Sequence, residues 1–270
     1  MIQIDKARCI SCGRCCYDCF PGALAMSAGT PTLVNPEACL ACGHCIAVCP
    51  KAAVADDTLN MEESMSVGTL PAADSLLQLM RFRRSCRHYT AKPVTGEELA
   101  PLLEAARACP TAKNLQATRY ITVTEKIPVL LDAALQTLGA IGEHQLTATD
   151  APDELRRARN FIAWRDRRRE DPAFDPLFFH APRLLLFVSD KSCARDAAAG
   201  AAYAELMAAA SGLGCLYSGY FTACVSASSE LKTLLQLRPG EELVRCLVLG
   251  HPDIRFLRTA PRRPADLTIL

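Results

Sequence analysis

Two cysteine runs in the first fifty residues constrain the fold of this chain more than any other feature. Residues 9–19 read CISCGRCCYDC and residues 39–49 read CLACGHCIAVC. An offset of 30 residues superposes the runs, aligns four cysteine positions and places Gly13 over Gly43. Self-similarity at a fixed period indicates a repeated structural unit. The sequence therefore predicts that the N-terminal part folds as two copies of one small motif.

The spacing CxxCxxCxxxC in each run is typical of bacterial ferredoxins. In that arrangement the first three thiolates hold one iron–sulfur cluster and the fourth crosses to the neighbouring cluster. Two copies of the run make this exchange reciprocal. We predict two [4Fe-4S] clusters, with cluster 1 held by Cys9, Cys12, Cys15 and Cys49, and cluster 2 held by Cys39, Cys42, Cys45 and Cys19. Zinc is the alternative, although its structural sites usually pair CxxC knuckles across a longer gap.

Some cysteines fall outside this ligand pattern. Cys16 lies opposite Ile46, an apolar position, so we expect Cys16 to pack rather than to bind iron. Phe20 follows Cys19 whereas a proline follows Cys49, and we expect this difference to alter packing around one cluster. The remaining cysteines have no ligand spacing, and we expect small buried hydrophobic residues at Cys86, Cys109, Cys193, Cys215, Cys224 and Cys246.

Charge and composition exclude several classes of protein. Lys and Arg number 30 against 29 Asp and Glu, and a net charge of +1 provides no field to attract nucleic acid or an acidic membrane surface. The N-terminus lacks a signal-peptide pattern, and no apolar run approaches the roughly 18 residues of a membrane span. We expect a cytoplasmic protein. Thiols stay reduced in the cytoplasm, which favours metal binding over disulfides for the 15 cysteines.

The chain length of 270 residues suits one medium-sized domain with a small one attached. After Val54 the sequence becomes acidic, rich in small residues and free of apolar periodicity. We therefore expect a two-[4Fe-4S] domain over residues 1–57, a linker over 58–74 and a larger domain over 75–270.

Local patterns in the larger domain mix helices and strands. Thr95 and Glu98 have the spacing of a capping box, which predicts a helix that begins near Thr95. Apolar and β-branched runs predict strands at 119–124, 183–189 and 242–250. An alanine-rich stretch that starts at residue 196 predicts a buried helix ending at Gly212 or Gly214. Together these elements indicate an α+β fold.

Four stretches of the larger domain carry more than a fold signal. RRSCRHY (83–89) places three arginines around a serine, a set suited to a phosphate group. CPTAKNLQ (109–116) has the Pro and Asn of an ordered turn, and the glycines of GLGCLYSGYF (212–221) let the backbone approach a flat ligand. LRTAPRRP (257–264) adds three arginines. None of the four is specific by itself.

In this order and with these spacings, the four stretches resemble the nitroreductase family of flavoproteins over nearly all of residues 76–270. With the cysteine-rich part added, the whole chain is similar to the ferredoxin-fused nitroreductases. The resemblance implies a three-layer α+β sandwich that forms a homodimer and holds FMN at the subunit interface. A small ferredoxin-like domain with two [4Fe-4S] clusters would precede it.

The resemblance also implies which residues hold FMN. The family's Arg-x-Ser-x-Arg motif would meet the phosphate and the pyrimidine side of the flavin. Its Pro-Ser-x-x-Asn-x-Gln loop, in which Thr111 replaces the commoner serine, would lie along the isoalloxazine ring. The implied contacts are Arg83, Arg84, Ser85, Arg87, Pro110, Thr111, Ala112, Lys113, Asn114, Gln116, Ser218, Gly219, Arg262 and Arg263. Either Arg262 or Arg263 would contact the FMN phosphate. The family leaves the chemistry to the flavin, so no catalytic side chain is implied.

Three functions stay open on the sequence. The first is an FMN-dependent oxidoreductase that passes electrons from a low-potential donor through two clusters to FMN. The donor would be a protein such as a ferredoxin or flavodoxin. The flavin would then reduce a small organic acceptor such as a nitroaromatic or quinone. The second is an NAD(P)H-dependent nitroreductase whose clusters are not essential. The third is an electron-transfer module that serves a protein partner. The first function best explains why clusters and FMN occur in one chain. A flavin can accept electrons one at a time from the clusters and then pass two electrons to an organic acceptor.

The segment 153–171 occupies the place where the family inserts variable helices over the flavin. It contains seven arginines and the only tryptophan, Trp164. A solvated amphipathic helix with Trp164 in its apolar seam is one interpretation. A lid over the flavin, or a basic patch that docks an acidic electron donor, is the other. His180 is either a residue that faces the flavin or a structural one.

Overall fold

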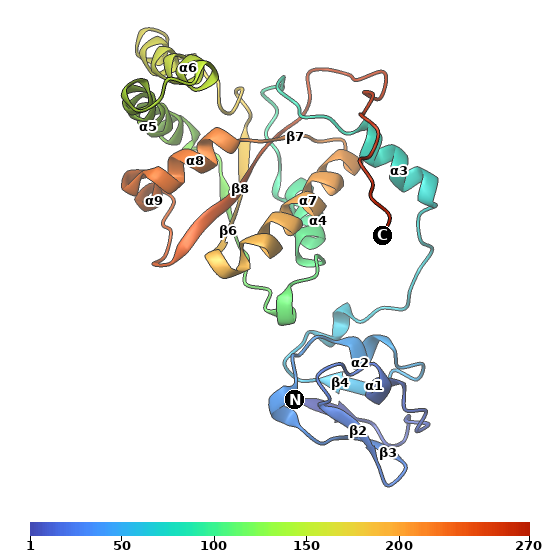
Figure 1. Cartoon of the computed structure of the whole chain (residues 1–270). Helices are drawn as coiled ribbons and strands as arrows, with labels where there is room; N and C mark the ends of the chain where they lie inside the picture. Colours follow the sequence, from blue (N-terminus) through green and yellow to red (C-terminus); the bar gives the residue numbers. More distant parts are fainter. The chain divides into compact units, whose positions relative to one another are not determined.

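The computed structural model describes all 270 residues, and its internal contacts divide the chain into two units. Unit 1 comprises Met1–Pro71 together with Thr111–Leu115, and unit 2 comprises Ala72–Pro110 and Gln116–Leu270. Figure 1 shows the elements of each unit.

The sequence repeat is visible in the backbone of unit 1. Helix α1 (Arg14–Tyr17) follows Gly13, and helix α2 (His44–Ala47) follows Gly43, with φ angles of 74° and 73° at the two glycines. Residues with a side chain rarely adopt this left-handed conformation, so each copy of the motif requires glycine there. The prediction of two copies of one small motif is confirmed.

Short antiparallel strand pairs complete unit 1. Strand β1 (Ile2–Ile4) pairs with β4 (Val54–Asp56), and β2 (Leu24–Ser27) pairs with β3 (Thr30–Leu33). The short 3-10 helices η1 (Pro36–Ala38) and η2 (Met61–Glu63) also belong to unit 1, and η2 lies inside the segment expected as a linker. Ile2, Leu24 and Val54 form a small core with Cys15 and Cys45.

Unit 2 contains a four-stranded antiparallel sheet in the order β5-β6-β8-β7. Strands β5 (Arg119–Val123), β6 (Arg183–Asp190) and β8 (Glu241–Gly250) confirm the three strands expected from the sequence. Strand β7 (Gly214–Tyr217) was not predicted, because four residues between glycine and serine give too short a pattern to recognise.

Both faces of this sheet are covered by apolar side chains. In β6, Leu184, Leu186 and Val188 face one core while Leu185 and Phe187 face the other, as the two-residue period of a strand requires. A bulge in the pairing of β6 with β8 shifts the register between Phe187 and Val188. A sheet buried on both faces needs a helical layer on each side.

Those layers make unit 2 a three-layer sandwich, and the predicted α+β fold is confirmed. Helices α4 (Gly96–Arg107) and α7 (Ala194–Ala210) cover one face, while α5 (Ile127–Ala148), α8 (Gly219–Ala227) and α9 (Ser229–Leu234) cover the other (Figure 1). Thr95 and Glu98 form the expected capping box at the start of α4. Gly212, with φ 76°, follows the end of α7 as expected.

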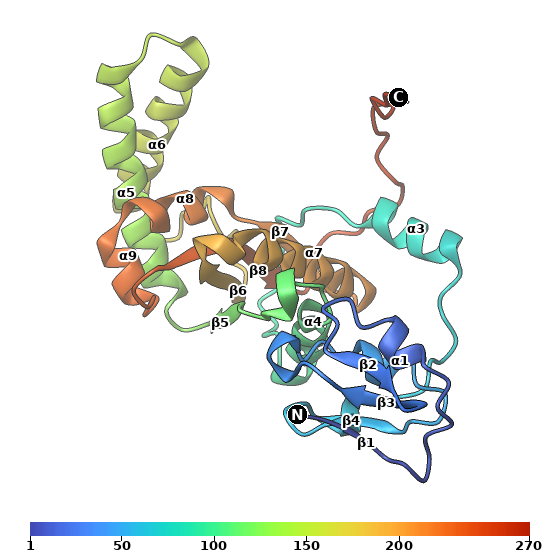
Figure 2. The same ribbon diagram turned by 60° about the horizontal axis from the view of Figure 1, so that its bottom comes forward.

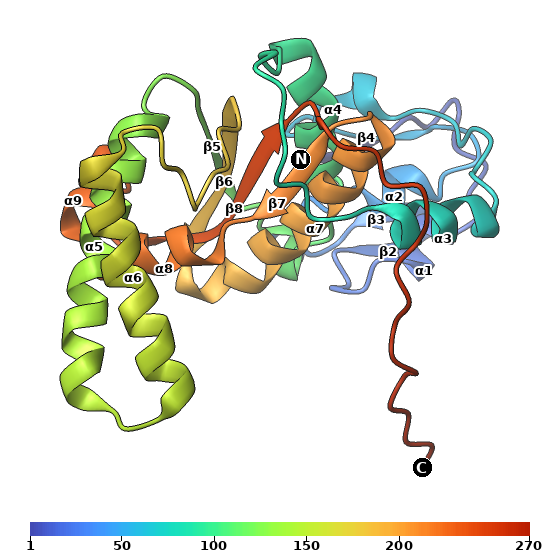
Figure 3. The ribbon, with the colours of Figure 1, turned by 90° about the horizontal axis from the view of Figure 1, so that it is seen from above.

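Helix α5 and helix α6 (Pro152–Glu170) form a long antiparallel hairpin that projects from the rest of unit 2 (Figures 2 and 3). The two helices approach closely at Gly142, where an added Cβ would lie 2.6 Å from the carbonyl oxygen of Ala158. Glycine at this position therefore sets the spacing of the hairpin.

Two peripheral segments of unit 2 have few buried side chains. Helix α3 (Ala73–Phe82) has no fully buried residue, and four of its apolar side chains are each at least 41% exposed: Leu76, Leu77, Met80 and Phe82. From residue 254 onward the chain forms no helix or strand and extends away from the sheet (Figure 3). No helix of the structure has both the length and the apolar composition needed to cross a membrane.

Candidate functional site

The cysteines of unit 1 surround two separate cavities. Cys9, Cys12, Cys15 and Cys49 line one cavity, and Cys19, Cys39, Cys42 and Cys45 line the other. The structure therefore brings together the same two sets that the sequence assigned to clusters 1 and 2, including the exchange of Cys19 and Cys49 between the repeats. The thiols lie around each cavity, and no three His, Cys, Asp or Glu side chains meet in a geometry that holds a single metal ion.

The surroundings of these cavities suit iron–sulfur clusters. The backbone N–H of Leu24 donates to Cys19 Sγ at 3.4 Å, and the N–H of Ala53 donates to Cys49 Sγ at 3.2 Å. Such bonds stabilise negative charge on the sulfur and tune the potential of a cluster. Burial raises the pKa of the Cys45 thiol to about 11, so iron must displace a proton from it on binding. Four thiols and an apolar wall at each cavity fit a cubane.

Phe20 itself does not pack against a cluster cavity. Its side chain is 97% exposed, so it cannot pack around a cluster. Cys16 lies outside both cavities and packs, half-buried, against the core of unit 1. The expectation for the scattered cysteines is confirmed, since all six are buried: Cys86, Cys109, Cys193, Cys215, Cys224 and Cys246.

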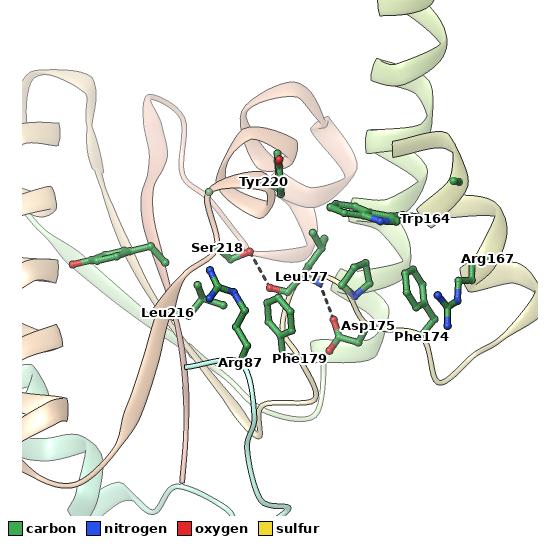
Figure 4. Close-up of a pocket in the computed structure, with 14 residues that line it drawn as sticks. Arg87, Trp164, Arg167, Phe174, Asp175, Leu177, Phe179, Leu216, Ser218 and Tyr220 are labelled. Carbon is green, nitrogen blue, oxygen red and sulfur yellow. Dashed lines mark hydrogen bonds between the residues drawn. The ribbon is translucent and has the colours of Figure 1, made fainter. Parts of the chain in front are cut away.

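Unit 2 contains a cavity of about 940 Å³, which we call the main pocket. Its walls come from the end of β7, the start of α8, the C-terminal half of α6 and the loop 174–179, with Arg87 at one end (Figure 4). Of the residues that the resemblance assigned to FMN, the structure brings three together here, namely Arg87, Ser218 and Gly219.

These three residues form a polar end of the main pocket. Ser218 occupies the N-cap position of α8, and its hydroxyl donates to the carbonyl oxygen of Leu177 at 3.2 Å instead of capping the helix (Figure 4). The first-turn N–H groups of a helix have no partner within the helix and favour anionic groups. A Cβ added to Gly219 would meet no atom within 4 Å, so open space lies in front of this glycine. The guanidinium of Arg87 lies 6.0 Å from the centre of the Phe179 ring and forms no ion pair.

Asp175 holds the loop that forms the floor of the main pocket. Its carboxylate accepts the backbone N–H groups of Leu177, Phe178 and His180 at 2.8–3.1 Å. Phe179 and His180 have φ angles of 56° and 58°, an uncommon conformation that these hydrogen bonds maintain. The exposed His180 therefore participates in the loop through its backbone, which favours the structural interpretation.

Aromatic rings form the opposite end of the main pocket. Trp164 and Tyr220 line this end and pack on the buried Phe161, with centroid separations of 5.2–6.0 Å among the three rings. Phe174 lies 4.3 Å from the guanidinium of Arg167. Sequence reasoning singled out Trp164 but missed Phe174, Phe179 and Tyr220. The aromatic run FDPLFFH at 174–180 was the available signal.

Arg83 and Arg84 line a second cavity, of about 300 Å³. Arg83 Nη1 lies 2.8 Å from Glu205 Oε1, an ion pair that the sequence did not predict. Arg255, which the sequence also missed, lines the same cavity. Ser85 is exposed, and it forms a parallel β-bridge with Cys215 of β7. The four residues of the motif at 83–87 are therefore divided between two cavities and the edge of β7.

The loop that the resemblance places along the flavin is not part of the main pocket. Thr111–Leu115 groups with unit 1, where Asn114 Nδ2 donates to the carbonyl oxygen of Ala41 at 3.0 Å. Lys113, Asn114 and Gln116 have φ angles between 46° and 54°. Non-glycine residues in this conformation store strain and occur preferentially at functional sites. Arg262 and Arg263 are exposed residues of the C-terminal segment and line neither cavity.

Most arginines in the last turns of α6 are engaged within the hairpin. Arg165 pairs with Glu143 at 2.6 Å, Arg168 pairs with Asp132 at 2.8 Å, and Arg169 lies 3.5 Å from Asp166. Trp164 and Arg167 instead line the main pocket. The helix is therefore one wall of a cavity as well as a solvated surface.

Comparison with known protein families assigns both parts of the chain. Residues 80–251 match the model of the nitroreductase family, and residues 1–51 match a 4Fe-4S dicluster domain. No curated protein matches the chain.

Solved structures with the same fold cover unit 2. A nitroreductase with bound FMN from Bacteroides fragilis NCTC 9343 is 17% identical with a TM-score of 0.53, and the match covers 72% of this chain and 98% of that one. A nitroreductase with bound FMN from Desulfitobacterium hafniense DCB-2 is 22% identical with a TM-score of 0.52, covering 72% and 97%. An FMN-dependent nitroreductase from Clostridium difficile R20291 is 18% identical with a TM-score of 0.54, covering 74% and 100%.

Proposed function

The chain belongs to the nitroreductase family and carries an N-terminal 4Fe-4S dicluster domain, and from this premise we propose that it is an FMN-dependent oxidoreductase supplied with electrons through its own clusters. Electrons from a low-potential donor pass through two [4Fe-4S] clusters to FMN and on to an organic acceptor such as a nitroaromatic or quinone. The observation that carries this proposal is the presence in one chain of two four-cysteine cavities and a large aromatic pocket.

FMN fits the polar end of the main pocket. Arg87 has no carboxylate partner there, Ser218 and the start of α8 supply polar groups, and the space in front of Gly219 is open. Related structures described as nitroreductases contain bound FMN, which supports the same cofactor in this chain. Arg84 and either Arg262 or Arg263 are our candidates for the phosphate. Bound FMN would accept single electrons and deliver them in pairs as a hydride equivalent.

The clusters would supply low-potential single electrons. We assign cluster 1 to Cys9, Cys12, Cys15 and Cys49, and cluster 2 to Cys39, Cys42, Cys45 and Cys19, on the two cavities that these residues line.

The chain's own side chains would position the acceptor and exclude water. Trp164, Tyr220 and Phe174 provide flat apolar surfaces, which suit a planar acceptor. Reduction of a nitro group to a nitroso group consumes two electrons and two protons and releases water. No acid or base of the main pocket is assigned to these protons, since Asp175 is engaged with backbone N–H groups.

We further propose a homodimer in the cytoplasm. Four apolar side chains of α3 are each at least 41% exposed, which supports a second copy as their partner. A ferredoxin or flavodoxin is the donor that we propose, because low-potential clusters need a low-potential source.

Anaerobic stopped-flow absorbance of the purified protein tests this function. Reduced ferredoxin should reduce the flavin quickly, whereas NADH and NADPH should do so slowly or not at all. Fast reduction by NADPH together with none by ferredoxin would favour the NAD(P)H-dependent alternative. A colourless protein that contains zinc would refute the cluster assignment.

A further inference from the structure

Arg167 differs from the arginines around it on α6. Arg165, Arg168 and Arg169 each lie within ion-pair distance of a carboxylate on α5 or α6. No carboxylate lies within that distance of Arg167, whose guanidinium stacks on the ring of Phe174 and lines the main pocket. Its charge is therefore available to a ligand of the pocket.

Two cations and one anion line the main pocket, and none of them forms an ion pair with Arg167. Arg87 and Asp175 are the only other charged residues that line it. Both oxygens of the Asp175 carboxylate accept hydrogen bonds from backbone N–H groups of its own loop, so this carboxylate stabilises the loop conformation. Arg87 lies at the opposite end beside Ser218, the end that we assign to FMN (Figure 4). An anionic group at the Arg167 end would meet a cation that forms no ion pair with Asp175.

Aromatic rings surround the Arg167 end. Trp164 precedes Arg167 by one turn of α6, and Phe174 lies beside the guanidinium (Figure 4). Stacking on Phe174 restrains the guanidinium plane, which leaves its edge free to donate two parallel hydrogen bonds to a carboxylate. A flat ring would contact the aromatic walls while its carboxylate meets Arg167.

We propose that Arg167 determines specificity for an aromatic acceptor that carries a carboxylate group. This proposal rests on the proposed function for the statement that the ligand is the electron acceptor. The binding preference itself follows from the chain's own side chains and can be measured without turnover.

Isothermal titration calorimetry of the oxidised holoprotein with benzoate and benzamide tests the binding preference. These probes have the same ring and differ in charge, and neither is reduced. We expect benzoate to bind more tightly than benzamide to the wild type, and Arg167→Gln to weaken benzoate binding about tenfold, the effect of losing a charge-assisted hydrogen bond, without changing benzamide binding.

Arg169→Gln is the matched control, since it removes the same charge two residues away and outside the pocket. It should bind both probes as the wild type does. Equal affinities for the two probes in the wild type, or an equal loss in Arg169→Gln, would overturn the proposal. Should Arg167→Gln fail to fold, Arg167→Lys keeps the charge and must still prefer benzoate, and loss of that preference would equally overturn the proposal.

Turnover with 4-nitrobenzoate and 4-nitrobenzamide separates this proposal from the proposed function. Reduction of both compounds at equal kcat/KM by the wild type and Arg167→Gln would refute the role of Arg167 and retain the oxidoreductase. Arg167-dependent benzoate binding without reduction of either nitro compound would retain the binding site and refute the nitroaromatic activity.

Discussion

Arg83 Nη1 lies 2.8 Å from Glu205 Oε1, and this pair ties the start of the segment 83–89 to helix α7. The Glu205 side chain is only 11% exposed, so its charge depends on Arg83 for compensation. Just beyond it, the N–H of Cys86 donates to the carbonyl oxygen of Cys215 at 2.9 Å and holds the segment along β7. These contacts place Arg87 at the main pocket.

A double-mutant cycle tests the energetic role of this pair. Arg83→Ala should lower the free energy of unfolding by about 1–3 kcal/mol, because it leaves a largely buried carboxylate without its charged partner. Adding Glu205→Ala should restore part of that loss. Urea denaturation followed by circular dichroism measures both effects, and strictly additive single-mutant effects would show that the two residues do not couple.

Arg87→Ala should reduce the affinity for FMN about tenfold, because it removes a cation that has no partner other than the ligand. The dissociation constant is obtained by adding FMN to protein stripped of flavin and following the flavin absorbance. Arg169→Ala, which lies outside the main pocket, provides the control and should bind FMN normally. Equal affinities in the two variants would remove Arg87 from the FMN site.

Gly142→Ala should destabilise the helical hairpin by about 1–3 kcal/mol, since the new methyl group would lie 2.6 Å from a backbone oxygen of α6 that cannot yield locally. The emission of Trp164 on α6 should shift as well. Gly96→Ala is the comparison, because its Cβ meets no atom within 4 Å. That change should leave stability unchanged or raise it slightly. A similar loss in both variants would show that the close approach at Gly142 is not responsible.

Glu241 should make stability depend on pH in the acid range. Arg119 donates to its carboxylate, which lowers the pKa of Glu241 below its ordinary value of 4.5. A group with a lowered folded-state pKa stabilises the fold above its unfolded pKa, and the contribution is lost as pH falls through the folded value. Wild type should therefore lose more stability below pH 4.5 than Glu241→Gln. Glu242→Gln, an exposed neighbour, should behave like the wild type in urea denaturation at each pH.

The elements that the sequence predicted are those whose signals are local. β6 is a run of apolar residues, α4 begins with a capping box, and the cysteine runs contain their own ligand spacing. Even the exchange of Cys19 and Cys49 was predictable, because the duplicated motif fixes it.

The site depends instead on contacts between distant segments. Glu205 lies 122 residues from Arg83, and no local pattern links the two. The main pocket combines Arg87 with residues near 164, 174 and 218, and its aromatic walls come partly from a loop whose conformation is set by Asp175. Exposure of Phe20 was equally unpredictable, since the repeat identifies the position but not the direction of its side chain.

The most direct test of the account is the rate at which reduced ferredoxin reduces the flavin in wild type, Cys19→Ala and Cys16→Ala. Cys19 lines the cluster 2 cavity whereas Cys16 lines neither cavity. Cys19→Ala should reduce the flavin at less than about a tenth of the wild-type rate, because a cubane that loses a thiolate is impaired or lost. Cys16→Ala should match the wild type, and FMN content should be equal in all three. A wild-type rate in Cys19→Ala, with iron measured to be lost, would show that electrons reach the flavin without cluster 2 and would contradict the account.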